Sequence, residues 1–159
     1  MNRLYKESVK NTKDVLLNDY NKVDELSNNL PEWTELHPIT EPSPKSKGFA
    51  VSSSIGVYRI IYKPTNQVAS IGCGNVNCRK ARHKGVHKNK GKTMMTKNGA
   101  PSPSMTGMHM YKHDKDINNW LFQWTHIGNK PLAEQYEKLL QHKEKPLFNM
   151  LCRQLFYAR

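Results

Sequence analysis

The chain has 159 residues, which is about the size of one domain, and its apolar content suffices for a modest core. Its formal charge of +12 at pH 7 favours a polyanionic partner, because lysines and arginines that approach phosphates release counterions. Its three cysteines make no disulfide framework, its first residues lack the apolar core of a signal peptide, and no apolar run approaches the ~18 residues of a membrane span. We therefore expect an intracellular, cytoplasmic protein rather than a secreted or membrane-spanning one.

The acidic residues are spread unevenly along the chain. Of the 13, eight lie between Glu7 and Glu41, none lies between Pro42 and His113, and five lie between Asp114 and Glu144. The acid-free segment carries 13 lysines and arginines. We expect nucleic acid, if bound, to lie along this middle segment.

Residues 1–47 are predicted to form an appended element, followed by a domain over residues 48–159. The apolar positions Leu16, Tyr20 and Val23 suit one face of an amphipathic helix that ends near Pro31. Four prolines between residues 31 and 47 then indicate an extended connector.

A β-hairpin is predicted near the start of the domain. Residues 55–62 and 67–72 are rich in β-branched and aromatic side chains and flank a turn-forming tetrapeptide, and residues 49–54 are a candidate leading strand. Asn75 can cap a following helix, on which Arg79, His83 and His87 would share one face because they are four residues apart.

The second half of the domain is predicted to contain a long loop, a strand and a helix. Residues 84–116 lack apolar periodicity and are rich in Lys, Gly, Pro, Ser and Met, which is typical of a functional or disordered insertion. Residues 119–127 have the character of a buried strand, and Lys130-Pro131 opens a helix with an apolar face.

Five short motifs in this order resemble those of the GIY-YIG nucleases. The first two are Gly56-Val57-Tyr58 and Ser70-Ile71-Gly72, with valine in place of isoleucine and serine in place of the second tyrosine. The third is the helix start Asn75-Val76 with Arg79 and His83, and the last two are Glu137 and the closure Pro146-Leu147-Phe148-Asn149.

The resemblance implies an α/β (α+β) fold with a small three-stranded antiparallel sheet flanked by helices. It implies an endonuclease that hydrolyses DNA phosphodiester bonds with Mg²⁺ or Mn²⁺. Small stand-alone members of this family often belong to phages, mobile elements or restriction systems. Cleavage of both strands of double-stranded DNA would require a homodimer or two sequential nicks.

The roles of individual residues follow from the same resemblance. Tyr58 would be the general base or its assistant, Glu137 the metal ligand and Arg79 the group that stabilises charge on phosphorus. His83 would contact phosphate or help to protonate the leaving oxygen. Ser70 and Asn149 occupy the remaining motif positions.

Two of these assignments have rivals in the sequence. Arg82 competes with Arg79, which we prefer because it keeps the family's spacing to both Asn75 and His83. Helical geometry places Glu137 at the border of the apolar face, whereas Glu134 points into solvent and Glu144 comes where the helix is expected to end.

The basic segment supplies candidates for DNA contacts. Lysines and an arginine on the helix and the following loop are candidates for phosphate contacts, and methionines of the loop are candidates for groove contacts. The basic candidates are Lys80, Arg82, Lys84, Lys88, Lys90, Lys92 and Lys97. The candidates for contacts to a groove or to bases are Met94, Met95, Met105, Met108 and Tyr111.

Three other interpretations remain open. Cys73, Cys78, His83 and His87 form a series that loosely fits a zinc site. Loss of the second motif tyrosine at Ser70 is compatible with a catalytically weakened nucleic-acid-binding protein on the same scaffold. A basic RNA-binding accessory protein would bind nucleic acid without metal-dependent cleavage.

Overall fold

The computed structural model describes residues 28–149. Contacts divide the chain into two units, Met1–Leu30 and Pro31–Arg159, and the description below concerns the second. The amphipathic helix predicted before Pro31 lies almost wholly outside the described residues, as do the last ten residues of the chain.

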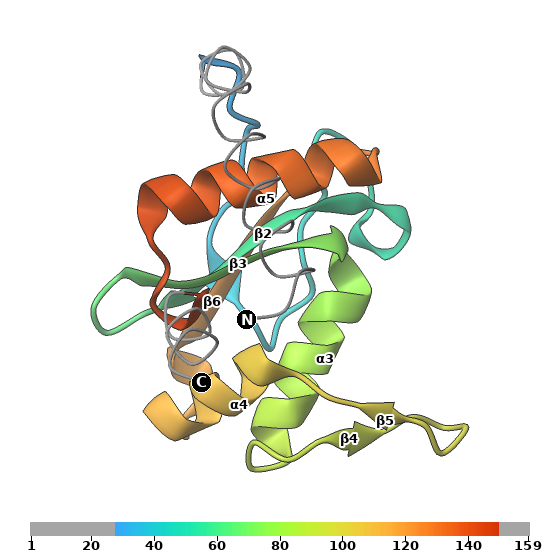
Figure 1. The fold of residues 1–159 in the computed structure, drawn as a ribbon, viewed down its shortest axis with the longest axis vertical. Helices are drawn as coiled ribbons and strands as arrows, with labels where there is room; N and C mark the ends of the chain where they lie inside the picture. The colour runs from blue at the N-terminus through green and yellow to red at the C-terminus, as the bar shows by residue number, and fades with distance from the viewer. Residues whose placement is uncertain (1–27, 150–159) are drawn as a thin grey trace, which may run out of the picture. The chain divides into compact units, whose positions relative to one another are not determined.

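A four-stranded antiparallel sheet forms the centre of the second unit (Figure 1). Across the sheet the strands are β1 (His37–Pro38), β6 (Trp120–His126), β2 (Ile55–Tyr62) and β3 (Gln67–Asn75). Every neighbouring pair is antiparallel. The mixed α and β class is therefore confirmed, but the sheet has four strands rather than three because the proline-rich connector contributes β1.

The predicted hairpin and the predicted buried strand are both confirmed. β2 is central, with β3 on one side and β6 on the other, so Tyr58 has Gly72 as one neighbour and Trp124 as the other. Gly56 allows the close approach of β2 to β6, since a Cβ at this position would lie 2.2 Å from the carbonyl oxygen of Thr125. β3 is left as an edge strand.

Within residues 28–149, three α-helices pack around the sheet, namely α3 (Val76–Lys88), α4 (Met105–His113) and α5 (Lys130–Glu144). Each begins with a polar cap whose side chain accepts a hydrogen bond from an N–H of the first turn: Asn75 for α3, Ser104 for α4 and Asn129 for α5. The predicted cap of the basic helix is thus confirmed. Within residues 28–149, no helix combines the length and apolar character needed to cross a bilayer.

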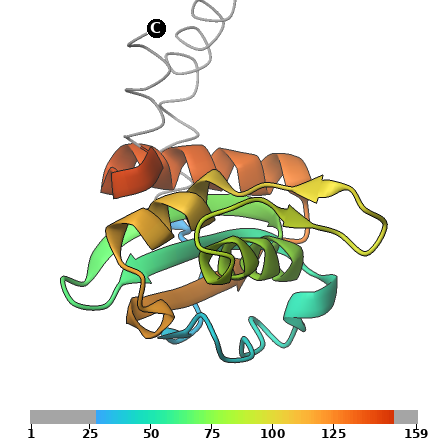
Figure 2. The ribbon, with the colours of Figure 1, turned by 90° about the horizontal axis from the view of Figure 1, so that it is seen from below.

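Different helices cover the two faces of the sheet (Figure 2). Tyr58 and Ile60 belong to a buried cluster that also contains Val76 of α3 and Met110 of α4. Arg59 points to the opposite face because side chains alternate along a strand, and its guanidinium forms an ion pair of 2.7 Å with Glu144 of α5. The site described below lies where α3 and α5 both contact β3.

Two segments differ from the predictions. Residues 49–54, expected to be a strand, contain the 3₁₀ turn η1 (Val51–Ser53). Residues 84–116, expected to be a loop, contain the end of α3, the short strands β4 (Met94–Met95) and β5 (Pro101–Ser102), and α4. The buried residues of α4 are only Gly107 and Met110, so the helix leaves no apolar periodicity in the sequence.

Candidate active site

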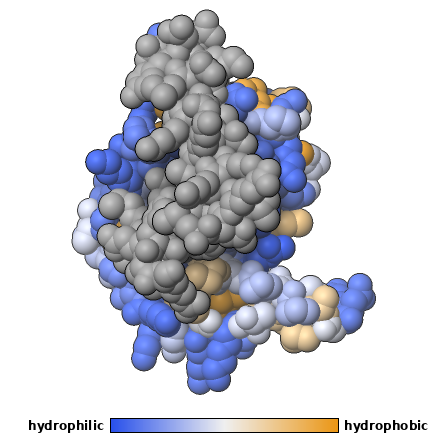
Figure 3. All heavy atoms as spheres, in the orientation of Figure 1, coloured by the Kyte–Doolittle hydropathy of each residue, from blue (hydrophilic) through white to orange (hydrophobic). Residues whose placement is uncertain are grey.

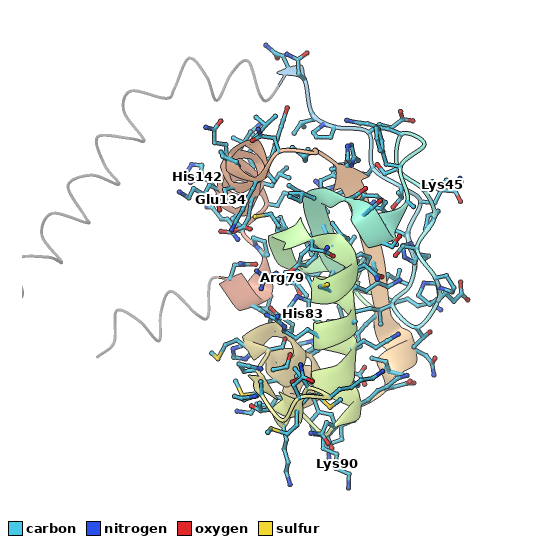
Figure 4. The ribbon with its side chains drawn as sticks, turned by 90° about the vertical axis from the view of Figure 1, so that its right-hand side faces the viewer. Lys45, Arg79, His83, Lys90, Glu134 and His142 are labelled. Atoms are coloured by element: carbon cyan, nitrogen blue, oxygen red, sulfur yellow. The ribbon has the colours of Figure 1, made fainter. Side chains whose placement is uncertain are left out.

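Three hydrogen-bonded side chains from different elements form the buried part of the site. The Tyr58 hydroxyl of β2 lies 2.7 Å from His83 Nε2 of α3, and His83 Nδ1 lies 2.6 Å from the Ser104 hydroxyl. Ser104 is also the cap of α4, where its oxygen accepts the Gly107 N–H. The exposed fractions of Tyr58 and His83 are 4% and 6%. Figure 4 shows His83 and Arg79 on the same helix.

Burial controls the protonation of the hydrogen-bonded side chains of Tyr58 and His83. Burial, followed by the charges of Arg79 and Arg82, lowers the pKa of His83 to about 3, so its imidazole is neutral near pH 7. Burial also raises the pKa of Tyr58 above its usual value, so the phenol keeps its proton. A neutral imidazole has one donor and one acceptor nitrogen, which allows Tyr58 to donate to His83 and His83 to donate to Ser104.

This geometry corrects the role predicted for His83. Its side chain is buried and both ring nitrogens have partners within the protein. His83 therefore has no free nitrogen for direct contact with a phosphate or a leaving oxygen.

The absence of a side chain at Gly72 makes room for the Tyr58 ring. A Cβ on Gly72 would lie 2.2 Å from the Tyr58 hydroxyl oxygen and 2.4 Å from the adjoining ring carbon. Any other residue at this position would push the phenol away from His83. The close contact with the phenol is therefore a direct steric reason for glycine at the third position of the Ser70-Ile71-Gly72 motif.

Arg79 is an exposed cation beside this phenol. It lies in the first turn of α3, where its Nε would be 3.4 Å from a Cβ built on Gly74. Among residues 28–149 the guanidinium has no carboxylate partner in an ion pair. The positive charge of Arg79 opposes the rise in the pKa of Tyr58 more strongly than that of Arg82 does. This order supports Arg79 over Arg82 as the charge closest to the phenol.

Glu137 of α5 supplies a half-buried carboxylate to the same region. Gln141, one turn later, lies 3.4 Å from Glu137 Oε1 and donates to the carbonyl of Ile71 at 3.0 Å. Burial, followed by hydrogen bonding to Glu137, raises the pKa of the Cys73 thiol to about 12, so the thiol stays protonated and donates to the carboxylate. Gln141 and Cys73 therefore hold the Glu137 carboxylate against β3.

Arg79 and Glu137 act on the same phenol with opposite signs. After burial, the two largest influences on the pKa of Tyr58 are Arg79, which lowers it, and Glu137, which raises it. Both charges therefore lie within electrostatic reach of the Tyr58 oxygen. Three of the predicted residues, Tyr58 of the central strand β2, Arg79 of α3 and Glu137 of α5, are therefore near enough for the two charges to affect the phenol.

Asn149 holds the backbone of β3 rather than contributing to the reactive groups. Its Oδ1 accepts the N–H of Ile71 at 3.0 Å, and its Nδ2 lies 3.4 Å from the carbonyl oxygen of the same residue. The amide thereby pairs with the free side of an edge strand. Asn149 is a positioning residue for the Ser70-Ile71-Gly72 segment.

Ser70 also lies away from the reactive groups. It is buried, and its hydroxyl oxygen lies 3.4 Å from that of Thr106 in α4. A tyrosine ring at this position would need the space that α4 occupies. The packing of α4 against β3 is therefore a physical reason for the small residue, and no contact with Tyr58 or Glu137 supports a catalytic role.

The predicted phosphate contacts fall into two groups. Lys80 is buried, and its ammonium donates to the carbonyl of Glu41 and to the hydroxyl of Ser43 at 2.8 Å. Lys80 therefore anchors the connector to α3, and its prediction as a DNA contact is corrected. Arg82 and Lys84 are half-buried, and four more lysines are exposed: Lys88, Lys90, Lys92 and Lys97.

Three residues of the site, Ser104, Gln141 and Cys73, were not among those predicted for it. Ser104 stands three residues before Gly107 at a helix start, which is a usual position for a cap. Gln141 follows Glu137 by four residues and so shares its helix face. No sequence signal connects Cys73 with Glu137, because the contact joins a strand to a distant helix.

Within the described residues, the cysteines and histidines of the proposed zinc site do not come together. His83 is bonded to Tyr58 and Ser104, and His87 Nε2 lies 2.8 Å from the carbonyl oxygen of Asp114. Cys78 is exposed. Within residues 28–149, no three His, Cys, Asp or Glu side chains are grouped closely enough to hold a metal ion together.

Comparison of the chain with family models, with curated proteins and with solved structures gives no match. The geometry and chemistry of the residues themselves therefore carry the functional argument.

The buried neutral His83 predicts a particular dependence of stability on pH. In the unfolded chain an imidazole of ordinary pKa, near 6.5, binds a proton that the folded His83 does not bind until about pH 3. The contribution of the neutral His83 to the free energy of unfolding is therefore complete above pH 6.5 and is lost as the pH falls toward 3. Between pH 7 and pH 5 the wild type should lose about 2 kcal/mol more unfolding free energy than His83→Gln.

Denaturant unfolding at a series of pH values measures this difference. His142→Gln, which removes an exposed histidine of α5, serves as the control and should keep the wild-type slope. If the His83→Gln and wild-type curves run parallel over this range, the imidazole is not buried in its neutral form. An NMR titration of the wild-type His83 ring gives the same answer even if the variant folds poorly.

Proposed function

We propose that the protein is a divalent-metal-dependent endonuclease that hydrolyses phosphodiester bonds in DNA on the plan of the GIY-YIG nucleases. The observation that carries the proposal is the Tyr58–His83 hydrogen bond with Arg79 and Glu137 both acting on the phenol. Hydrolysis of a phosphodiester requires a proton acceptor for water, a positive group for the charge on phosphorus and oxygen ligands for a hard cation. Tyr58, Arg79 and Glu137 match these three requirements.

The arrangement of the short motifs supports the family assignment. Tyr58 of the first tripeptide is paired across two strands with Gly72 of the second. Asn75 caps the helix that carries Arg79, and Asn149 binds the backbone of the second tripeptide. Motifs as far apart in the sequence as Gly56 and Asn149 thus meet around one segment of β3.

The buried hydrogen bond suggests how Tyr58 accepts a proton while it is neutral. The phenol donates its own proton to His83 Nε2 as its oxygen receives a proton from the attacking water. His83 Nε2 has a free lone pair because the imidazole is neutral, but burial lowers its pKa to about 3, so it holds the extra proton only transiently. That proton returns to the phenol as the phenol oxygen releases the proton of the water to solvent. This coupled transfer avoids a free phenolate, which burial disfavours by raising the pKa of Tyr58.

Arg79 stabilises the reacting phosphate in this mechanism. The new bond joins the water oxygen to phosphorus, and the bond from phosphorus to the leaving oxygen breaks. Negative charge grows on the phosphoryl oxygens during this step, and the unpaired, exposed guanidinium can bind two of them. The leaving oxygen takes its proton from solvent water.

Glu137 is the residue that would hold the divalent cation. Mg²⁺ keeps several waters and is often bound by one or two carboxylates together with substrate phosphates, so a single half-buried carboxylate fits this ion. The contacts from Gln141 and Cys73 orient the carboxylate. A bound cation would neutralise phosphate charge and lower the pKa of a coordinated water.

A second candidate is a nucleic-acid-binding protein that uses the same scaffold without cutting. The observation that favours it is the 4% exposure of Tyr58, which limits the access of water to the phenol. The replacement of the second motif tyrosine by Ser70 also favours this candidate. This candidate predicts tight DNA binding and no cleavage with Mg²⁺ or Mn²⁺.

Replacing Glu137 by glutamine should stop cutting and leave binding nearly intact, because the amide keeps the size of the side chain but loses the charge that binds the cation. Plasmid nicking with Mg²⁺ or Mn²⁺, together with DNA binding in EDTA, measures the two effects separately. Glu134→Gln, an exposed neighbour on the same helix, is the matched control and should cut like the wild type. Equal cutting by the two variants would remove Glu137 from the site, and a wild type that does not cut would favour the second candidate.

Replacing Arg79 by alanine should slow cleavage by roughly 10²- to 10³-fold, since a charge that stabilises the transition state is lost. Arg82→Ala should mainly weaken binding, because Arg82 acts less strongly on Tyr58. Single-turnover rates at saturating protein separate cleavage from affinity. The reverse result would show that Arg82, not Arg79, faces the reacting phosphate.

A further inference from the structure

A two-stranded arm projects from the molecule between α3 and α4. We call residues 92–103 the ribbon; it contains β4 and β5, paired as Met94 with Ser102 and Met95 with Pro101. Figures 1 and 2 show it extending beyond the helices, and Figure 3 shows that its end is hydrophilic. The residues of both strands are exposed or half-buried, so the ribbon has little core of its own.

The two faces of the ribbon differ in what they contact. The Met94 side chain packs toward α3, since its Cε and Cγ both lie 3.6 Å from a Cβ built on Gly85. Met95 points the other way because side chains alternate along a strand, and 62% of it is exposed. One face of the ribbon therefore rests on the domain, and the other presents an apolar side chain to solvent.

The tip carries polar groups that are suited to nucleic acid. A turn closed by the Thr96 N–H on the Ala100 carbonyl, at 2.8 Å, places Lys97 and Asn98 at the end of the ribbon. Gly99 adopts a positive φ of 75°, which this turn requires. No acidic residue lies between Pro42 and His113, so the ribbon has no negative charge in its own segment.

One end of the ribbon is bound to the end of α3, and the other leads into the candidate site. At one end the Asn89 amide donates to the carbonyls of Lys92 and Thr93 at 3.2 and 3.3 Å, which joins the ribbon to the end of α3. At the other end comes Ser104, whose hydroxyl lies 2.6 Å from His83 Nδ1. The ribbon is thus held in a defined position two hydrogen bonds away from Tyr58.

We propose that the ribbon enters the major groove of double-stranded DNA and contacts its bases and phosphates beside the cleaved bond. This inference rests on the proposed nucleic-acid substrate and adds the element that recognises it. The major groove of B-DNA admits a two-stranded β-ribbon, whereas the deep, narrow major groove of A-form RNA does not. Residues 92–103 include no aromatic residue, and single-stranded nucleic acids are bound mainly by stacking on aromatic rings.

The dimensions of the ribbon fit this role. About four residues separate its base from its tip, and at ~3.3 Å per residue they reach ~13 Å along the groove, or roughly four base pairs. Lys97 can bind phosphate or guanine, Asn98 can bind adenine, and Met95 can contact a thymine methyl group. Arg79 and Asn89 are ten residues apart on α3, ~15 Å at ~1.5 Å per residue, so the recognised bases should lie within about eight base pairs of the cut.

Binding of the full chain in EDTA tests the inference without requiring cleavage. The double variant Met95→Ala/Lys97→Ala should bind a DNA duplex roughly tenfold more weakly than the wild type, with a salt dependence reduced by about one charge. Its matched control is Leu36→Ala/Lys63→Ala, which removes an exposed apolar side chain and an exposed lysine in the β2–β3 turn. The control should bind within about twofold of the wild type.

Competing groove ligands identify which groove of the DNA the protein binds, and competing nucleic acids identify which kind of nucleic acid it prefers. Methyl green, a major-groove ligand, should displace the wild type from duplex DNA, whereas netropsin, a minor-groove ligand, should not. Unchanged duplex affinity in the ribbon variant, or tighter wild-type binding to single-stranded DNA or duplex RNA, would overturn the inference. Loss of binding in the ribbon variant without any metal-dependent cutting by the wild type would uphold the inference and reject the nuclease.

Discussion

The hydrogen bond of 2.7 Å between the Tyr58 hydroxyl and His83 Nε2 is the interaction on which the candidate site depends. It exists because β2 and α3 meet over Gly72, where any side chain would displace the phenol. Burial keeps the imidazole neutral and the phenol protonated, so neither group of the pair carries a charge at rest. Because both ring nitrogens of His83 have partners within the protein, the imidazole has no free nitrogen for direct contact with a ligand.

The edge strand β3 connects the buried pair to the charged groups around it. Gly72 lies beneath the phenol, Cys73 contacts Glu137, and Gly74 lies beside Arg79. The amide of Asn149 binds the free backbone groups of Ile71, which both protects the edge and fixes its position. A positive and a negative group are thus presented beside one neutral phenol, an arrangement suited to binding a phosphate together with a cation.

Local signals in the sequence predicted much of this arrangement. The hairpin followed from β-branched residues around a turn, the start of α3 from Asn75, and the start of α5 from Lys130-Pro131. Long-range contacts account for what was missed: β1 forms only because β6 offers an edge to the connector, and Lys80 is buried because Glu41 and Ser43 supply its acceptors. Ser70 was expected near the reactive groups, but the unforeseen helix α4 covers it.

Removal of the Tyr58 hydroxyl alone tests the central claim most directly. Tyr58→Phe keeps the ring stacked on Phe122, so the protein should fold and bind DNA in EDTA like the wild type. Tyr62→Phe, which removes a hydroxyl bonded to Asp114 at the far end of β2, is the control. With Mg²⁺ and plasmid DNA, we expect a cleavage rate lower by about 10²- to 10⁴-fold for Tyr58→Phe and unchanged for Tyr62→Phe. Cleavage by Tyr58→Phe at the wild-type rate would exclude the phenol from the chemistry.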